Sequence, residues 1–253
     1  MKSRFYRRET ESLEHSLTIR YRSSDVWVSY GGGPDPERMR ETLSARQQEM
    51  YNTLEMYMEE HRYFLTSLHP VPYDEEAPDI IRTMIAAGFY AGTGPMAAVA
   101  GTFAQEIGEL ALALGAQEVL VENGGDLYLN TRKDLQVGIY TGEDSALRGK
   151  LALEIPAGQM PLGLCTATGT YGHSFSFGKA DALAVLSHKT ALADALATAI
   201  CNRVDLDNSL VDLLEEYREK KEVLGILAVR GEEVVSMGDL RLIRPEDGTD
   251  GKE

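Results

Sequence analysis

The sequence predicts an α+β protein, and three observations support this fold class. Short β-rich runs lie near both ends of the chain, and a long stretch over residues 36–114 is rich in helix formers with helical spacing of apolar residues. Glycine-containing turns separate further apolar runs in the second half. The order of strands, helix, strands, helix and strands is compatible with an internal duplication.

The first half of the chain predicts a hairpin followed by helices. Met39, Leu43 and Met50 keep four- and seven-residue spacing in the first helix, and this stripe suits core or dimer packing. Small residues recur on one face of the third helix, so we expect that face to lie against the sheet. The predicted elements are a hairpin of 17–21 and 26–30, and helices over 36–63, 78–91 and 95–114.

The second half predicts mostly strands, and we expect runs 135–141 and 151–155 to extend the same sheet. We expect residues 1–244 to form a single domain and the polar residues 245–253 to be a disordered tail. The predicted strands are 118–122, 127–130, 135–141, 151–155, 163–168, 182–187, 223–230, 233–236 and 240–243, with helices over 190–202 and 209–220.

Composition and charge exclude several classes of protein. The net charge of -15 and the lack of a long basic stripe predict that the chain does not bind nucleic acid. Two cysteines are too few for a disulfide framework. No signal peptide and no uninterrupted apolar run of membrane-spanning length is recognised, so we expect a cytoplasmic protein that does not enter a membrane.

Thr93 and Gly94 precede the start of the third helix. Free N–H groups at a helix start attract anions, and a glycine lets a ligand approach the backbone. The alternative is an ordinary turn between two helices.

The segment Asn123, Gly124, Gly125 and Asp126 is a second candidate. A two-glycine turn between strands can present the Asn and Asp side chains to a pocket. An ordinary hairpin explains the same residues.

Residues 165–174 form a third candidate, because many hydroxyls, glycines and one imidazole follow a strand. Cys165 and His173 suggest a nucleophile pair, and Thr168 and Ser174 are candidate ligand contacts. The alternative is a buried structural thiol and a surface histidine.

Lys179 follows this loop and lies two residues before Asp181. The pair suggests either a phosphate-binding lysine with its partner or a surface ion pair.

Asp194 and Thr198 are four residues apart, so they share one face of the alanine-rich helix. A carboxylate and a hydroxyl are oxygen ligands of the type that Mg²⁺ accepts. An Asp near a helix start that interacts with the helix dipole is the alternative.

Two stretches resemble the ApbE superfamily, whose founding members are FAD:protein FMN transferases. Residues 119–126 (VLVENGGD) look like its strand and Gly-Gly-Asp turn, and residues 193–199 (ADALATA) look like its metal-binding helix. The chain to about Arg244 more closely resembles an uncharacterised cytoplasmic branch, marked by GPMAAVAG at 94–101 and by GHSFSFGKADA at 172–182.

The resemblance implies an ApbE-like fold of two related β-α units, with mixed or antiparallel sheets flanked by helices and a pocket between the units. It implies Mg²⁺ at Asp194, Thr198 and a backbone carbonyl near 94–98, and FAD or FMN as a ligand. The transferases carry a lysine within the segment that corresponds to 95–102, where this chain has only small apolar residues, and their Asp-Pro-x-Thr-Gly segment is replaced here.

Three functional hypotheses follow. The first is a protein that binds an anionic small molecule in the homocysteine formation and sulfur assimilation of anaerobes, a role associated with that branch, with Cys165 as an optional thiol or persulfide carrier. The second is an Mg²⁺-dependent FAD:protein FMN transferase. The third is a non-catalytic flavin- or nucleotide-binding subunit that forms a homodimer or a complex with other sulfur-assimilation proteins.

Overall fold

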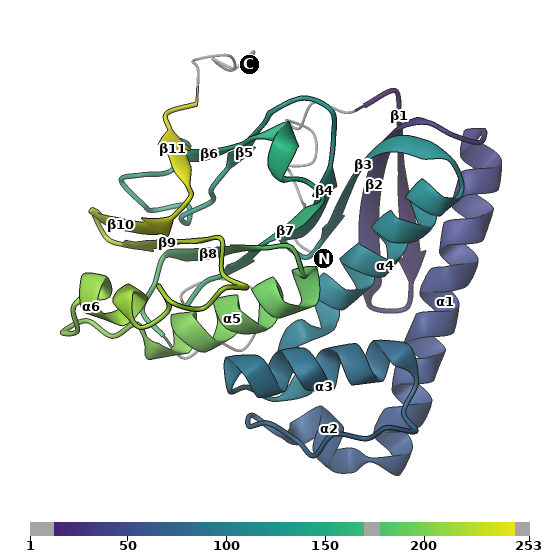
Figure 1. Cartoon of the computed structure of the whole chain (residues 1–253), viewed down its shortest axis with the longest axis horizontal. Helices are drawn as coiled ribbons and strands as arrows, with labels where there is room; N and C mark the ends of the chain where they lie inside the picture. The colour runs from purple at the N-terminus through teal and green to yellow at the C-terminus, as the bar shows by residue number, and fades with distance from the viewer. Residues whose placement is uncertain (1–12, 170–177, 246–253) are drawn as a thin grey trace.

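The structure is a computed structural model that describes residues 13–169 and 178–245. These residues form an eight-stranded antiparallel sheet in the order β1-β2-β3-β4-β7-β8-β9-β10 and a three-stranded sheet in the order β11-β6-β5 (Figure 1). The large sheet contains β1 (His15–Tyr21), β2 (Ser24–Gly32), β3 (Ala116–Asn123), β4 (Asp126–Asn130), β7 (Leu162–Ala167), β8 (Ala182–Ser187), β9 (Gly225–Arg230) and β10 (Glu233–Gly238). The small sheet contains β5 (Leu135–Gly138), β6 (Ala152–Ile155) and β11 (Arg241–Ile243).

Helices connect the strands at two points of the chain. Between β2 and β3 lie α1 (Pro36–Glu60), α2 (Arg62–Thr66), α3 (Asp79–Ala91), the 3₁₀ turn η2 (Pro95–Ala98) and α4 (Val99–Ala113). The turn η3 (Ala157–Gln159) precedes β7, and α5 (Thr190–Arg203) and α6 (Leu210–Glu215) lie between β8 and β9. No helix among the described residues combines the length and apolarity needed to cross a membrane.

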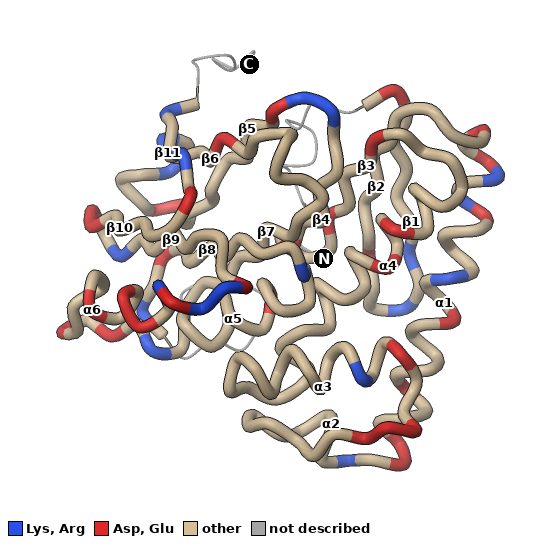
Figure 2. The backbone as a smooth tube through the Cα atoms, viewed as in Figure 1, with Lys and Arg blue, Asp and Glu red and all other residues tan. Residues whose placement is uncertain are grey.

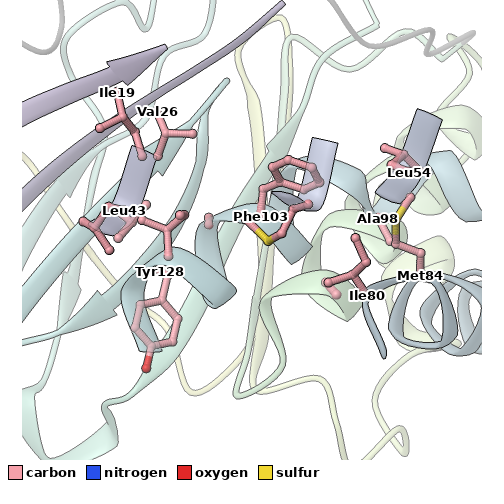
Figure 3. Packing of buried hydrophobic residues seen from close by; sticks show 14 of the residues in the cluster. Ile19, Val26, Leu43, Leu54, Ile80, Met84, Ala98, Phe103 and Tyr128 are labelled. Carbon is pink, nitrogen blue, oxygen red and sulfur yellow. The ribbon is translucent and has the colours of Figure 1, made fainter. Parts of the chain in front are cut away.

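Helices cover one face of the large sheet and the small sheet covers the other (Figure 1). On the helical face, α1 and α4 pack on β1–β4, and α3 packs against η2, α4 and α5. Figure 3 shows Leu43, Phe103 and Tyr128 in one cluster on this face. A second cluster joins α5 and α6 to β7–β10. On the opposite face, Leu153 and Ile155 of β6 pack over Leu164. Both faces of the large sheet are therefore buried, one by helices and the other by the small sheet.

The structure confirms the hairpin and most of the predicted elements, and it corrects four details. The first helix ends at Glu60, because His61 leaves helical geometry with φ −121° and ψ 71° before α2 begins. The third helix starts as a 3₁₀ turn, and the helix predicted over 209–220 ends at Glu215.

The fourth correction concerns runs 135–141 and 151–155, which do not extend the large sheet. They pair with each other and with β11 in a separate sheet. The reason is burial of apolar surface. The strand β6 does not pair with the edge of the large sheet, because its apolar side chains are buried by packing on the face of that sheet.

The small-residue face of α4 packs against both a strand and a helix. A Cβ at Gly108 would lie 2.2 Å from Cδ1 of Tyr128 in β4. A Cβ at Gly101 would lie 2.5 Å from the carbonyl oxygen of Thr190 and 2.8 Å from Cβ of Asp194, both in α5. The predicted close approach to the sheet is therefore present at Gly108, whereas Gly101 admits α5.

We predict that Gly108→Ala destabilises the protein by about 1–3 kcal/mol, because the added methyl group collides with the buried Tyr128 ring. This cost opposes a gain of about 1 kcal/mol from helix propensity. Urea unfolding measures the result. Adding Gly108→Ala to a Tyr128→Leu background should cost much less, and equal costs in both backgrounds would contradict the contact.

Candidate functional site

The turn between β3 and β4 lies opposite the start of α4. Gly124 and Gly125 have φ of 71° and 108°, a conformation that glycine adopts without strain in a two-residue hairpin. The Asn123 side chain donates from Nδ2 to the carbonyl oxygen of Ala100 at 3.1 Å. The turn is thus tied to the first residues of α4 by a side chain that the sequence singled out.

Asp194, in α5, also contacts the first turn of α4. It is 9% exposed, and its Oδ2 accepts the backbone N–H of Gly101 at 2.8 Å. That N–H belongs to the first turn of α4, where helices have N–H groups without an intrahelical partner, and the N-cap residue Ala98 offers no side-chain acceptor. Asp194 therefore caps a neighbouring helix.

Asp126 is buried beside Cys165 on the next strand. Oδ1 of Asp126 accepts the backbone N–H of Thr166 at 3.2 Å. Burial, together with the smaller effect of the nearby Glu122 charge, raises the pKa of Asp126 to about 7 against the hydrogen bond from Thr166. Glu122 is 4% exposed and accepts the Gly125 N–H at 2.9 Å.

The two aspartates influence each other. Burial raises the pKa of Asp194 well above its usual value, and the negative charge of Asp126 raises it further, against the hydrogen bonds from the first turn of α4. Within residues 13–169 and 178–245, neither carboxylate forms an ion pair with a Lys, Arg or His side chain. A proton or an added cation is therefore needed to neutralise the pair.

Cys165 does not have the surroundings of a reactive thiol. It is fully buried and donates to the carbonyl oxygen of Thr190 at 3.4 Å. Burial and the charges of both aspartates raise its pKa well above the usual value, whereas reactive thiols are partly exposed with a lowered pKa. This favours the structural alternative, and the catalytic role of Cys165 stays a prediction. His173 and Ser174 lie outside the described residues.

Thr93 and Gly94 lie under the segment that follows α2. Thr93 is 7% exposed, and its hydroxyl has no hydrogen-bond partner among the residues described. A Cβ at Gly94 would lie 1.8 Å from the carbonyl oxygen of Ser67. Glycine is required here by the crossing of two backbone segments, and ligand contact at these positions stays a prediction.

Thr198 is half-buried one turn after Asp194 on α5, and Thr168 is half-buried just beyond β7. Lys179 is exposed at the other end of α5, where its N–H donates to the Val204 carbonyl oxygen at 2.8 Å. Val204, the C-cap of α5, is ten positions after Asp194, which is about 15 Å along the helix axis. The structure therefore does not bring the Lys179 backbone to the carboxylate pair.

Asp181 binds a turn and does not pair with Lys179. Its Oδ2 accepts the N–H of Gly231 at 2.6 Å, and the described residues show no ion pair between Lys179 and Asp181. A ready-made metal cage is not found either, because no cluster of three or more His, Cys, Asp or Glu side chains in the described part of the chain is arranged to hold a metal ion. Any Mg²⁺ would depend on Asp194 together with hydroxyl, backbone or ligand oxygens.

Comparison with known proteins identifies the family of this chain. A family model described as AbpE bacteria matches residues 7–215. The chain belongs to this ApbE-like family. It is 41% identical to a UPF0280 protein of Methanospirillum hungatei, over 78% of this chain and 79% of that protein. A UPF0280 protein of Methanoculleus marisnigri is 46% identical over 70% of this chain and 71% of its own length.

Solved structures show the same fold. The apo form of the flavinyl transferase ApbE of Pseudomonas stutzeri has a TM-score of 0.56 and 16% identity, covering 88% of this chain and 93% of that one. The ApbE protein of Thermotoga maritima has a TM-score of 0.54 and 12% identity, covering 87% and 96%. The predicted ApbE-like family and α+β fold are confirmed.

We predict that the free energy of unfolding falls as pH rises from about 4 to 7 in part because of Asp126. Its pKa is about 7 in the folded chain and 3.8 in an ordinary setting, so the folded state holds a proton that the unfolded state loses. Asp126→Asn removes this ionisation and should gain about 2 kcal/mol over the native protein between pH 5 and pH 8. Urea unfolding with a chelator present measures this difference.

The control is Asp207→Asn, which changes an exposed aspartate in a loop. A difference between Asp126→Asn and the native protein that stays constant from pH 5 to pH 8 would contradict the raised pKa.

Proposed function

We propose that this protein binds a flavin nucleotide together with Mg²⁺ beside the first turn of α4. One observation carries the proposal: Asp126 and Asp194 are both buried, and neither pairs with a cationic side chain among the described residues. The shared fold supports flavin as the ligand, since the Pseudomonas stutzeri neighbour is named a flavinyl transferase.

The residues present suit Mg²⁺. Asp194 accepts N–H groups from the first turn of α4 and would add a carboxylate oxygen to a metal ion bound there, and the Thr198 hydroxyl follows one turn later on the same helix. Hard oxygen ligands of this type are preferred by Mg²⁺, which retains water and ligand phosphates in its octahedron. When bound, the ion would neutralise the negative charge of a pyrophosphate.

The chain itself would orient the nucleotide. Asn123 and Asp194 fix the start of α4 from two sides, so its partial positive charge has a defined direction. Residues 95–102 contain no lysine, in contrast to the transferases described above, and no cationic side chain of that segment can bind phosphate. Neutralisation of the nucleotide's phosphate charge would therefore depend on the metal ion. The missing lysine favours binding of the flavin nucleotide over transfer of its FMN group.

In this proposal, homocysteine formation and sulfur assimilation are the metabolism in which the protein would act, and they do not define the reaction at the site. The buried Cys165 thiol with a raised pKa does not favour covalent sulfur transfer. The proposed ligand is therefore the flavin nucleotide, and a persulfide at Cys165 is not part of it.

Calorimetric titration of FAD into the purified protein tests the proposal. We predict saturable binding that weakens about tenfold or more when Mg²⁺ is replaced by a chelator, and a similar loss in Asp194→Asn. Asp207→Asn should bind like the native protein. Equal affinity for FAD with Mg²⁺ and with chelator would contradict a contribution of Mg²⁺ to flavin binding.

The same samples separate transfer from binding. With FAD, Mg²⁺ and a flavoprotein acceptor, release of AMP identifies an FMN transferase. FAD binding without AMP release identifies a flavin-binding subunit.

A further inference from the structure

The helices α4 and α5 cap each other. The first N–H groups of α5 have no intrahelical partner, and the side chain of its N-cap residue Lys189 accepts none of them. The backbone N–H of Thr190 instead donates to Oε1 of Gln105 in α4 at 2.9 Å. This bond is the counterpart of the one in which Asp194 of α5 accepts the Gly101 N–H of α4 at 2.8 Å. Each helix therefore supplies an acceptor to the start of the other.

The Gln105 amide has a partner at both of its polar ends. A backbone N–H can only donate, so the atom that meets Thr190 is the carbonyl oxygen of the amide. Nε2 of the same amide donates to Oε1 of Glu109, one turn later on α4, at 2.8 Å. The Gln105 side chain is thus held in the orientation that bridges α4 to the start of α5.

The two interhelical bonds have matching spacing on both helices. Gly101 and Gln105 are four residues apart, so they lie on one face of α4. The same spacing separates Thr190 from Asp194 on α5. The bonds are therefore about 6 Å apart along the helix axes. Two bonds at this separation resist both rotation of α5 about its axis and sliding of α5 along α4, whereas one bond at Asp194 would not.

The start of α5 is also held from the large sheet. A Cβ at Gly163 of β7 would lie 2.5 Å from Cα of Thr190, so the backbone of α5 lies directly on that strand. The Cys165 thiol of β7 donates to the carbonyl oxygen of Thr190 at 3.4 Å. Thr190 is therefore a fixed point on the sheet, and Gln105 joins this point to α4.

Thr190, Asp194 and Thr198 follow one another at four-residue intervals, so they share one face of α5. We propose that Gln105 is a positioning residue for the Mg²⁺ site. By holding Thr190, it keeps the Asp194 carboxylate directed at the first turn of α4. This inference rests on the proposed function, because Asp194 and Thr198 are the metal ligands named there.

Two substitutions separate the acceptor from the rest of the side chain. Gln105→Met keeps the length of the side chain and removes the acceptor. Gln105→Glu keeps an acceptor beside the positive end of α5. Its repulsion of Glu109 is screened, because Glu109 is exposed.

Calorimetric titration of FAD into the purified full chain, with Mg²⁺ and with a chelator, tests the role. We predict that Mg²⁺ tightens FAD binding about tenfold or more in the native chain and in Gln105→Glu, and less than about threefold in Gln105→Met. The Kd in chelator should stay within about twofold of the native value in both variants. A variant that was only less stable would lose affinity in both conditions.

Gln48→Met is the matched control, because Gln48 is an exposed glutamine of α1. It should bind FAD like the native protein in both conditions. Absence of tightening by Mg²⁺ in the native chain would overturn the proposed function and this inference with it. Full tightening in Gln105→Met, or an equal loss in Gln105→Glu, would overturn the positioning role alone.

Hydrogen exchange of the metal-free chain gives a readout that needs no ligand. The Gly101 N–H should exchange about fivefold or more faster in Gln105→Met than in the native chain, because Asp194 holds it less firmly. The N–H of Leu227, in the interior strand β9, should change by less than about twofold. Equal exchange at Gly101 in the two proteins would overturn the positioning role, whatever the FAD titration shows.

Discussion

The contact between α4 and α5 at Gly101 determines the geometry of the candidate site. A side chain at position 101 would collide with Thr190 and Asp194, so glycine allows the two helices to approach. At that approach, the carboxylate of Asp194 accepts the N–H of Gly101 and satisfies a helix end that has no other cap. The same contact removes the carboxylate from water.

This contact has an electrostatic consequence. Asp194 is desolvated within the influence of Asp126, which the β3–β4 turn places on the same face of the sheet beside Cys165. Two buried carboxylates favour a proton or a cation in their surroundings. The proposed function and the pH dependence of stability both follow from that requirement.

Local features of the structure could be predicted from the sequence. Two adjacent glycines between apolar runs define the hairpin after Asn123, because few other residues adopt positive φ at both positions. Likewise, small residues at helical spacing correctly indicated that α4 approaches other backbone closely. Both features depend on residues that are close in the sequence, so residue propensity and the periodicity of small residues are sufficient to predict them.

Features that depend on distant residues could not be predicted in the same way. Asp194 caps a helix that starts 95 residues earlier, counting from 99 to 194, and no local signal connects the two. Gly94 suggested ligand access, but its requirement comes from Ser67 on another segment. The small sheet was missed because β6 pairs with β11, which lies almost at the end of the described chain. Glu122 belongs to the VLVENGGD stretch that the sequence analysis quotes, but its burial and its bond to the Gly125 N–H are visible only in the structure.

The most direct test is a crystal structure of the protein grown with Mn²⁺ and FAD, with anomalous scattering used to locate the metal. We predict an anomalous peak at a coordination distance of about 2.2 Å from the carboxylate of Asp194, next to Thr198 and the first turn of α4. A metal bound elsewhere, with the Asp194 carboxylate still contacting only the N–H groups of α4, would contradict it.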